Sequence, residues 1–469
     1  MSRGIGQRGY SMKHIPNRYF LPSSLIFLFL GTLVSPLVLT ACLGGPSIPR
    51  VGSSTTAPWL TLNSGRIYAW YASNSIKSNS LAVFRADTGA LLWRKSNVSS
   101  LFPYSSMQVA DATTAYVQTP KALLAIDVES GQERWHVEAQ DTWWIYADAV
   151  SNGIVYATVS PGNGGDPSLL ALEAANGKQI WKTTIAPLDR GGVQDVEVEG
   201  DRVFVRAENN FFVLQARDGK VLWSSYATSP IRAGGVVFLT RWRKTGDSII
   251  DAVQEKDGKL LWSFHPPTVD GEPQHAITAG PEDPLVHSII TSDGILGVES
   301  QGILYGVNTK NGSLLWNVAK KDIDYHPGSL FTANGIIYAQ SMDDTLLAIE
   351  AKSGTIPWSV HVDGGMGGVT LDSTGGILFV TVSSGLGPEY VEAVRANGKV
   401  LWKMQLQQTV GSPYWSYYQI ADGRIYQVVA RAVTDIKGSD IPLTYYKQMN
   451  LSATKIGDRT ALWSKLISV

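Results

Sequence analysis

Leu-Leu-Ala-Ile-Asp-Val-Glu-Ser-Gly-Gln-Glu-Arg-Trp, residues 123–135, is the stretch that decides the fold, because its pattern returns along a chain of 469 residues. A short apolar run comes first, a polar turn with glycine follows, and a tryptophan stands four residues after the glycine. Four or five apolar residues bounded by turn signals are typical of a buried strand and too few for a helix. The stretch therefore predicts two strands joined by a tight turn.

Copies of this turn and its tryptophan recur along the chain, so the sequence is built from repeats. Nine copies are found, and the last, Lys-Ile-Gly-Asp-Arg-Thr-Ala-Leu-Trp463, is degenerate. The repeat tryptophans are Trp93, Trp135, Trp181, Trp223, Trp262, Trp316, Trp358, Trp402 and Trp463. They stand 39 to 61 residues apart, a period that suits four short strands with their turns. A helix-pair repeat has a similar length, but the apolar runs before each turn are too short for helices.

A second hairpin precedes the first one in several repeats. Asn-Gly or Asp-Gly stands between apolar residues at 152–153, 334–335 and 422–423, and Ser64-Gly65 holds the same place in the first repeat. These dipeptides favour tight hairpin turns because glycine adopts positive φ without a steric cost. Two hairpins make one blade of four antiparallel strands, which cannot bury both of its faces alone. Blades stacked radially form a β-propeller, and each repeat tryptophan is expected to pack one blade against the next.

The motif Ala-Ile-Asp-x-x-x-Gly-x-x-x-Trp of residues 125–135 resembles the repeat of the quinoprotein (PQQ-like) propellers. The resemblance covers roughly residues 58–469 and implies an all-β, PQQ-like β-propeller. We therefore assign residues 59–469 to one propeller domain. Propellers of this family usually have eight blades. The nine repeats predict either nine blades or an eight-bladed ring that the degenerate last unit helps to close; we favour eight and keep nine as the alternative.

Residues 1–41 have the pattern of a bacterial lipoprotein signal peptide. Basic residues without any acidic residue come first, and the apolar run 25–30 follows. Leu39-Thr40-Ala41-Cys42 then resembles the lipobox, which implies that Cys42, the only cysteine, is lipidated and begins the mature chain. Residues 42–58, rich in Gly, Ser, Thr and Pro, predict a flexible tether. An uncleaved transmembrane anchor is the alternative, but glycine, serine and proline interrupt the apolar run.

Composition and motifs give little support for nucleic-acid binding or catalysis. The 39 lysine and arginine residues nearly balance the 40 acidic residues, so no nucleic-acid partner is expected. The seven histidines are scattered without a short metal-ligand spacing, and G-x-S-x-G and Walker motifs are absent. The resemblance to quinoproteins implies one enzymatic alternative, a PQQ-dependent dehydrogenase of alcohols or sugars that uses calcium. Many such enzymes have adjacent cysteines beside the cofactor, and Cys42 alone cannot form that disulfide.

Two aromatic clusters are candidate binding surfaces for a carbohydrate, a peptide or a quinone, because exposed aromatic rings are effective anchors. They consist of Trp143, Trp144, Tyr146, Tyr414, Trp415, Tyr417 and Tyr418. Burial within the propeller strands is the alternative for these residues. Asp195, Glu197 and Glu199 share one strand face and could attract calcium, but a solvated edge strand is the simpler interpretation. The Pro- and Gly-rich segment 265–287 predicts an inserted loop.

The lipobox and the lack of a catalytic motif favour one function. We expect a non-catalytic binding or scaffold protein outside the cytoplasm, which a lipid on Cys42 holds at a membrane and which binds a protein or a surface polymer. In fold and anchoring the chain is similar to the lipoprotein propeller of the outer-membrane protein assembly machine. We expect no cofactor. The dehydrogenase with PQQ and calcium is the alternative.

Overall fold

The computed structural model describes most of the chain from Trp59 onwards, and every regular element in the described part is a β-strand. The described residues are 59–72, 79–98, 111–119, 121–139, 142–161, 165–185, 192–207, 209–227, 230–242, 248–267, 286–300, 303–319, 330–341, 344–362, 365–371, 376–383, 389–406, 414–435, 443–457 and 459–468. Their strands form nine antiparallel sheets, eight with four strands and one with three. The predicted all-β fold is thus confirmed.

Each sheet is one blade and consists of consecutive strands. Blade 1 contains β1 (Trp59–Asn63), β2 (Arg66–Ala72), β3 (Asn79–Arg85) and β4 (Leu91–Val98). Blade 2 contains β5 (Thr114–Gln118), β6 (Ala122–Asp127) and β7 (Glu133–Glu138). Blade 3 contains β8 (Thr142–Ser151), β9 (Ile154–Pro161), β10 (Ser168–Glu173) and β11 (Gln179–Thr184). Blade 4 contains β12 (Val193–Glu199), β13 (Arg202–Ala207), β14 (Asn210–Gln215) and β15 (Val221–Tyr226). Blade 5 contains β16 (Ile231–Ala233), β17 (Val236–Trp242), β18 (Ser248–Gln254) and β19 (Leu260–Phe264). Blade 6 contains β20 (Val286–Ser292), β21 (Ile295–Ser300), β22 (Ile303–Asn308) and β23 (Leu314–Ala319). Blade 7 contains β24 (Leu330–Ala333), β25 (Ile336–Ser341), β26 (Thr345–Glu350) and β27 (Trp358–His361). Blade 8 contains β28 (Gly365–Leu371), β29 (Ile377–Ser383), β30 (Glu389–Arg395) and β31 (Val400–Gln405). Blade 9 contains β32 (Tyr414–Ala421), β33 (Arg424–Asp435), β34 (Leu443–Lys455) and β35 (Ala461–Ser468).

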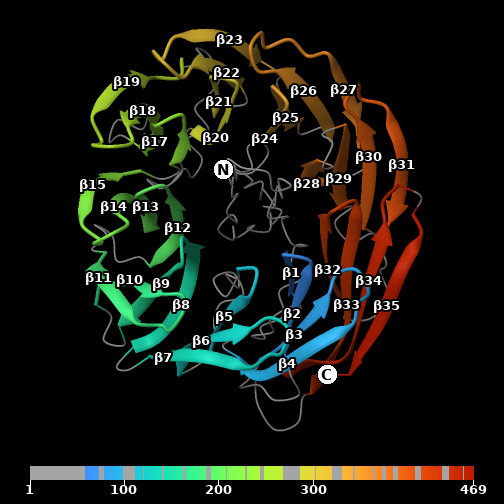
Figure 1. Cartoon of the computed structure of the whole chain (residues 1–469). Coiled ribbons are helices and arrows are strands. Elements are labelled where there is room, and N and C mark those ends of the chain that lie inside the picture. Colours follow the sequence, from blue (N-terminus) through green and yellow to red (C-terminus); the bar gives the residue numbers. More distant parts are fainter. Residues whose placement is uncertain are drawn as a thin grey trace, which may run out of the picture.

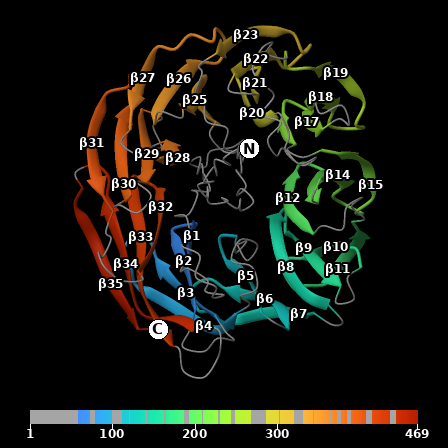
Figure 2. The same cartoon turned by 180° about the vertical axis from the view of Figure 1, so that it is seen from behind.

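The blades follow one another around a ring in the order of the sequence (Figures 1 and 2). In the four-stranded blades the first strand lies toward the centre, and the last strand, which carries the repeat tryptophan, forms the outer edge. The described residues of blade 2 supply β5, β6 and β7, and its tryptophan again lies on the outer strand. The structure therefore has the nine-bladed alternative, with one blade for each repeat, and the eight-bladed ring that we favour from the sequence does not form.

The ring closes where blade 9 meets blade 1, and none of the described sheets contains strands from both ends of the chain. Strand β1 lies beside β32 at this seam (Figure 1). The backbone N–H of Leu62 donates to Oε1 of Gln419 at 3.0 Å. Leu60 of blade 1 packs in one buried cluster with Tyr426 and Met449 of blade 9. Side-chain packing and hydrogen bonds thus close the ring without a shared sheet.

Two-residue turns connect the first and second strands of several blades, as the Asn-Gly and Asp-Gly pairs predict. Both residues have positive φ at Asn152-Gly153 (51° and 74°), Asn334-Gly335 (51° and 76°) and Asp422-Gly423 (49° and 67°). Positive φ at both central residues is the type I′ geometry, whose twist matches that of the flanking strands. The hairpins that the sequence predicts are present at these turns.

The repeat tryptophans join neighbouring blades. In eight of them the indole Nε1–H donates to a backbone carbonyl of the next blade at 2.6–3.1 Å. The donors and acceptors are Trp93 and Val128, Trp135 and Ala174, Trp181 and Ala216, Trp223 and Glu255, Trp262 and Thr309, Trp316 and Ala351, Trp358 and Ala396, and Trp463 and Ala86. The bond from Trp463 to Ala86 joins the last blade to the first.

The turn glycine of the repeat lies against the tryptophan of the preceding blade. A Cβ added to Gly131 would stand 2.6 Å from the ring of Trp93, and one added to Gly354 would stand 2.6 Å from that of Trp316. The same holds for Gly89, Gly177, Gly219, Gly258, Gly312 and Gly398. We call the unit of a tryptophan with the turn glycine and carbonyl of the next blade a tryptophan contact. Within one Gly-x-x-x-Trp repeat, the glycine therefore packs at the seam with the preceding blade, and the tryptophan packs at the seam with the next blade.

Candidate functional site

Charged side chains gather where blades 4 and 5 meet near the centre of the ring. Asp195, Glu197 and Glu199 alternate along β12, and Arg232 lies on β16 of the next blade. Arg232 donates through Nη2 to Oε2 of Glu197 at 2.6 Å and through Nη1 to Oε2 of Glu199 at 2.9 Å. One guanidinium group of blade 5 therefore binds two carboxylates of blade 4.

Further contacts enclose the Arg232 side chain, which is only 15% exposed. Its guanidinium carbon lies 3.6 Å from the centre of the Phe204 ring, and Nη1 lies 3.6 Å from Oε2 of Glu255. Glu255 also accepts a hydrogen bond from Nη1 of Arg202 at 2.9 Å. Because Arg232 and Glu255 are largely removed from water, at 15% and 14% exposure, salt screens their attraction less than it screens surface pairs. The Arg232 cluster comprises Glu197, Glu199, Arg202, Phe204, Arg232 and Glu255.

Asp148 of blade 3 is a carboxyl group in an unusual place. It is the extra residue of a β-bulge in β8, between Ala147 and Ala149. The residue as a whole is half-buried, but its Oδ2 atom is shielded from solvent and has no hydrogen-bond partner in the described part of the chain. Desolvation raises the pKa of Asp148 to about 8; polar groups of Thr158 oppose this rise, and the charge of Asp195 adds to it.

Asp195 shares this behaviour. Desolvation raises its pKa to about 7, the negative charge of Glu197 adds to the rise, and the positive charge of Arg206, which lies opposite on β13, opposes it. Near neutral pH, Asp148 and Asp195 therefore both exist partly as neutral acids. This pair of carboxyl groups can take up or release protons in the physiological range, which ordinary aspartates cannot do.

The calcium interpretation of the β12 carboxylates does not agree with this geometry, because Arg232 already binds Glu197 and Glu199. β12 is an edge strand, but Glu197 is 30% exposed and only Glu199, at 60%, is largely solvated. Among the residues that the structure describes, no three His, Cys, Asp or Glu side chains are arranged to hold a metal ion. In the described part of the chain, Glu197 and Glu199 therefore pair with an arginine rather than form an open calcium site.

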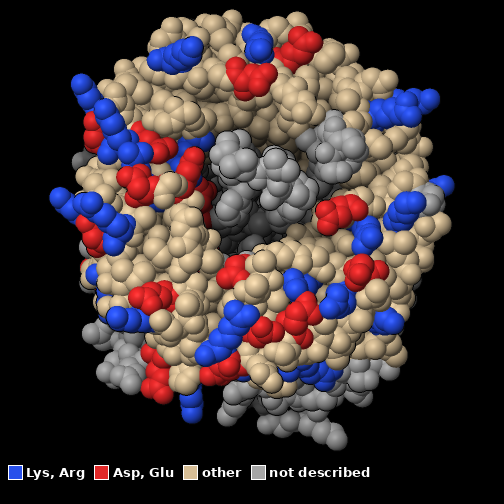
Figure 3. Space-filling model, viewed as in Figure 1, with Lys and Arg blue, Asp and Glu red and all other residues tan. Residues whose placement is uncertain are grey.

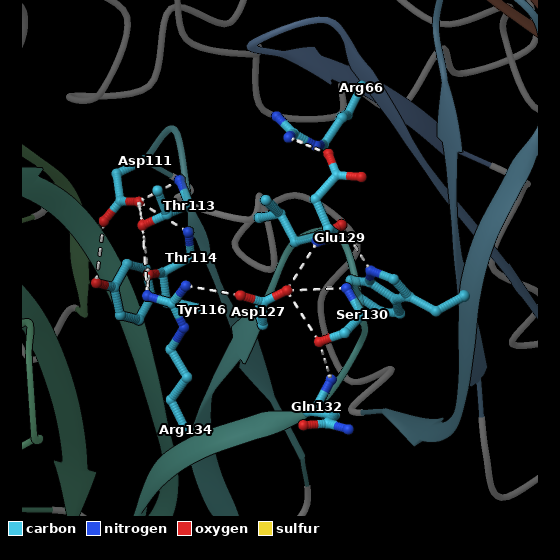
Figure 4. Close-up of polar contacts among 12 residues, drawn as sticks. Arg66, Asp111, Thr113, Thr114, Tyr116, Asp127, Glu129, Ser130, Gln132 and Arg134 are labelled. Atoms are coloured by element: carbon cyan, nitrogen blue, oxygen red, sulfur yellow. Dashed lines mark hydrogen bonds and ion pairs between the residues drawn. The ribbon is translucent and has the colours of Figure 1, made fainter.

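A second polar network orders the turn between β6 and β7 and links it to blade 1 (Figure 4). Asp127 accepts hydrogen bonds from Nη2 of Arg134 at 2.7 Å and from the backbone N–H of Ser130 at 2.8 Å. These bonds, above all that of Arg134, hold the pKa of Asp127 well below its usual value. Glu129, one residue earlier than Ser130, forms an ion pair with Arg66 of blade 1. The network stabilises the turn that receives the tryptophan contact from blade 1.

The two aromatic clusters lie at the beginning of the inner strands β8 and β32. Tyr146 is buried, and its hydroxyl donates to the Val193 carbonyl of blade 4 at 3.2 Å. Tyr418 is partly buried against the core between blades 8 and 9. Burial within the propeller, the alternative from the sequence, therefore describes these two residues. The remaining side chains, for which a binding role stays a prediction, lie outside the described part: Trp143, Trp144, Tyr414, Trp415 and Tyr417.

Other predicted features also lie outside the described residues, namely Cys42, the signal peptide, the tether and most of segment 265–287. Within the described ranges, no helix is long and apolar enough to span a membrane. On the face of the ring shown in Figure 3, acidic and basic side chains are interspersed rather than gathered by sign. This mixture agrees with the balanced charge of the sequence.

Sequence patterns do not single out Asp148 or Arg232, the two residues that define this region. A signal for Asp148 exists, since a carboxylate between alanines of an apolar strand is costly unless it is paired or neutral. Arg232 offers no comparable signal. Its partner Glu197 is 35 residues away in the chain, and only the stacking of blades brings them together.

Comparison with known proteins identifies the family. The family model described as "Outer membrane protein assembly factor BamB" matches residues 121–239, 165–326 and 246–468. These overlapping matches run from blade 2 to blade 9 and cover most of the chain. The chain belongs to this family. BamB-family membership confirms the resemblance to the PQQ-like propeller repeat that the sequence shows.

Individual relatives are distant. An outer membrane protein assembly factor BamB of Yersinia pestis is 24% identical over 225 residues, 41% of this chain and 51% of the relative, so the chain spans about half the length of that curated relative. The crystal structure of BamB from Moraxella catarrhalis aligns at 16% identity with a TM-score of 0.45, over 75% of this chain and 98% of that one. A quinohemoprotein alcohol dehydrogenase from Comamonas testosteroni also aligns at 16% identity and a TM-score of 0.45, over 87% and 76%.

Proposed function

We propose that this protein is a non-catalytic scaffold of the cell envelope, which a lipid on Cys42 holds at a membrane and which binds a protein partner. The match of the BamB family model from residue 121 to residue 468 is the observation that carries the proposal. The description of that family names outer membrane protein assembly, so the expected partner is a protein of this assembly process. A surface polymer is the other class of partner that the sequence leaves open.

The described charged residues support a structural use rather than a catalytic one. Arg232 joins blades 4 and 5 through Glu197 and Glu199, and the network of Asp127 orders a turn at the seam of blades 1 and 2. Contacts of this kind hold blade 1 against blade 2 and blade 4 against blade 5, and such local rigidity lowers the entropic cost of binding a partner.

The partner can be tested with the full-length protein purified from its native membrane after chemical cross-linking in cells. We expect the cross-linked material to contain a protein of outer-membrane assembly in near-stoichiometric amount, identified by mass spectrometry. The same chain without residues 1–41 and with Cys42→Ser, expressed without export, is the control for adventitious capture. Recovery of no envelope protein above that control would contradict the scaffold proposal.

Catalysis is tested separately on the purified propeller. PQQ and calcium are added, and absorbance of bound cofactor and dye reduction with alcohols and sugars are measured. The scaffold proposal expects neither signal. Dye reduction that depends on PQQ, calcium and one of these substrates would replace the proposal with the dehydrogenase alternative.

The anchor is tested with Cys42→Ala. Because two or more acyl chains hold a protein at a bilayer far more firmly than one, loss of the lipidated residue should release most of the protein from the membrane fraction. The leader should also remain uncleaved, which mass spectrometry of the N-terminal peptide detects. A variant that is as membrane-bound and as fully processed as the parent would show that Cys42 is not lipidated.

A further inference from the structure

Eight of the nine seams between blades have a complete tryptophan contact, and the seam between blades 8 and 9 differs. Its tryptophan is Trp402 on β31, which is partly buried against Ile456 and other apolar residues of the two blades. No hydrogen bond from Nε1 of Trp402 reaches another described residue. The hydrogen bond that joins the other blades is thus missing at this seam in the described part of the structure.

The turn of blade 9 shows the physical reason. Arg459 stands four residues before Trp463, the position of the turn glycine in the other repeats, and it has a φ of 60°. At the other seams a Cβ at this position would lie 2.5–2.8 Å from the ring of the preceding tryptophan. Arg459 brings such a Cβ to the turn that Trp402 faces. A Cβ at this turn therefore leaves less room for the ring of Trp402 than the turn glycines leave for the equivalent tryptophans.

The neighbouring seam, between blades 9 and 1, has the complete tryptophan contact. Trp463 donates to the Ala86 carbonyl at 3.1 Å and packs on Gly89. Leu62 adds its backbone hydrogen bond to Gln419. A tryptophan hydrogen bond thus joins blade 9 to blade 1, whereas the described contact of Trp402 with blade 9 is apolar packing.

We infer that the ring has a weak seam between blades 8 and 9, at which blade 9 separates transiently from blade 8 while it stays bound to blade 1. The ring therefore opens inside the chain and not at the junction of its two ends. Separation uncovers apolar surface around Ile456 and Trp402, which are otherwise covered by the neighbouring blade. A seam that opens in this way is a conformational device, and it does not depend on the proposed scaffold function.

Thiol labelling can measure the opening of single seams, because Cys42 is the only cysteine and can be replaced by serine. Ile456→Cys reports on the weak seam, and Val128→Cys reports on the seam of Trp93; both parent residues are buried, at 3% and 1% exposure, and both precede the equivalent turn. Loss of one hydrogen bond between blades corresponds to roughly a tenfold change in an equilibrium constant. We expect Ile456→Cys to be labelled about tenfold faster than Val128→Cys under native conditions.

A second substitution shows whether the missing glycine is the cause. Arg459→Gly in the Ile456→Cys chain should slow labelling to the rate of Val128→Cys, whereas a cavity left by the cysteine itself would keep labelling fast. Equal rates for the two cysteines in the parent background, or no effect of Arg459→Gly, would overturn the inference.

A measurement without introduced cysteines covers the case in which Ile456→Cys does not fold. Trp358→Phe removes an indole N–H that donates to Ala396 at 2.6 Å, and Trp402→Phe removes one that has no such acceptor among the described residues. Trp402→Phe should therefore lower the urea midpoint less than Trp358→Phe does. An equal or larger loss for Trp402→Phe would contradict a weak seam.

Discussion

A glycine of the Gly-x-x-x-Trp repeat meets two physical requirements at one residue. Gly131 has a φ of 70°, which disfavours any residue with a Cβ, and it also lies against the ring of Trp93. Gly153, in a two-residue turn, has nearly the same φ of 74° but has open space around its missing Cβ. A comparison of substitutions at these two glycines therefore separates the free-energy cost of the backbone conformation from that of the steric contact.

Gly131→Ala should lower the free energy of unfolding by about 3 kcal/mol, since the left-handed conformation and the forced contact with Trp93 both count against the alanine. Gly153→Ala should lose only the conformational part, about 1 kcal/mol. Urea denaturation followed by tryptophan fluorescence measures both values. Equal losses for the two variants would mean that the contact with Trp93 is not a constraint.

Asp148 predicts a pH dependence of stability. Its pKa in the folded protein, about 8, is far above the ordinary value of 3.8, so the folded state holds this proton more tightly than the unfolded state. The stabilisation from the bound proton is complete below about pH 4 and is lost as the pH rises to about 8. Asp148→Asn, which stays neutral, should therefore nearly match the parent at pH 3.5 and exceed its stability at pH 8.5 by at least about 1 kcal/mol. Thermal unfolding across this range checks the prediction, and a constant difference between the variants would refute it.

At the scale of elements, β12 and β16 show how stacking makes a polar site from separate hairpins. Val196 and Val198 of β12 pack toward blade 3, so the alternate residues Glu197 and Glu199 face blade 5. There they meet Arg232, whose side chain lies over the Phe204 ring. The period of two along the strand thus directs its apolar residues to one seam and its carboxylates to the next.

Arg232→Ala should destabilise the protein by about 3 kcal/mol, because it leaves Glu197 and Glu255 partly buried without their shared partner. Arg217, whose side chain is 76% exposed and pairs with Asp218 at 3.3 Å, is the matched control. Arg217→Ala should change the stability by less than about 0.5 kcal/mol. Denaturation in urea compares the two. If both variants lose similar amounts, the Arg232 cluster is no more than a surface ion pair.

The elements that can be predicted from the sequence are those that neighbouring residues in the chain determine. Turn glycines and apolar runs act within a few residues, so the hairpins at Asn152-Gly153 and the strand at Leu123 can be predicted from the chain itself. Burial of Tyr146 and the pairing of Arg232 depend on which blade stacks on which face, and a single repeat contains no record of this. The number of blades belongs to the same class, since it depends on the angle between neighbouring blades, which the interdigitation of side chains at every seam determines.

At the scale of the whole molecule, nine blades form the ring, and no described sheet joins its first and last blades. Each four-stranded blade is formed by consecutive strands, and the closing seam is held by Trp463, Leu62 and Gln419 rather than by a shared sheet. The seam between blades 6 and 7 is therefore equivalent to the seam between blades 9 and 1, although the chain runs directly from one blade to the next only at the former. Where the chain is cut should matter little if every seam still forms.

A circular permutant tests this equivalence. Joining residue 468 to residue 59 through a flexible linker and opening the chain between Ala319 and Leu330 should give a protein that unfolds cooperatively at nearly the parent urea midpoint. A chain that ends at Leu406, and so lacks blade 9, should not, because Leu60 and Ile67 of blade 1 and Phe379 of blade 8 lose the blade that covers them. Circular dichroism, size-exclusion chromatography and urea denaturation compare the two proteins. Cooperative, monomeric unfolding of the truncated chain would show that eight blades can close a ring, and failure of the permutant would show that the native ends have a role in closure that the described contacts do not explain.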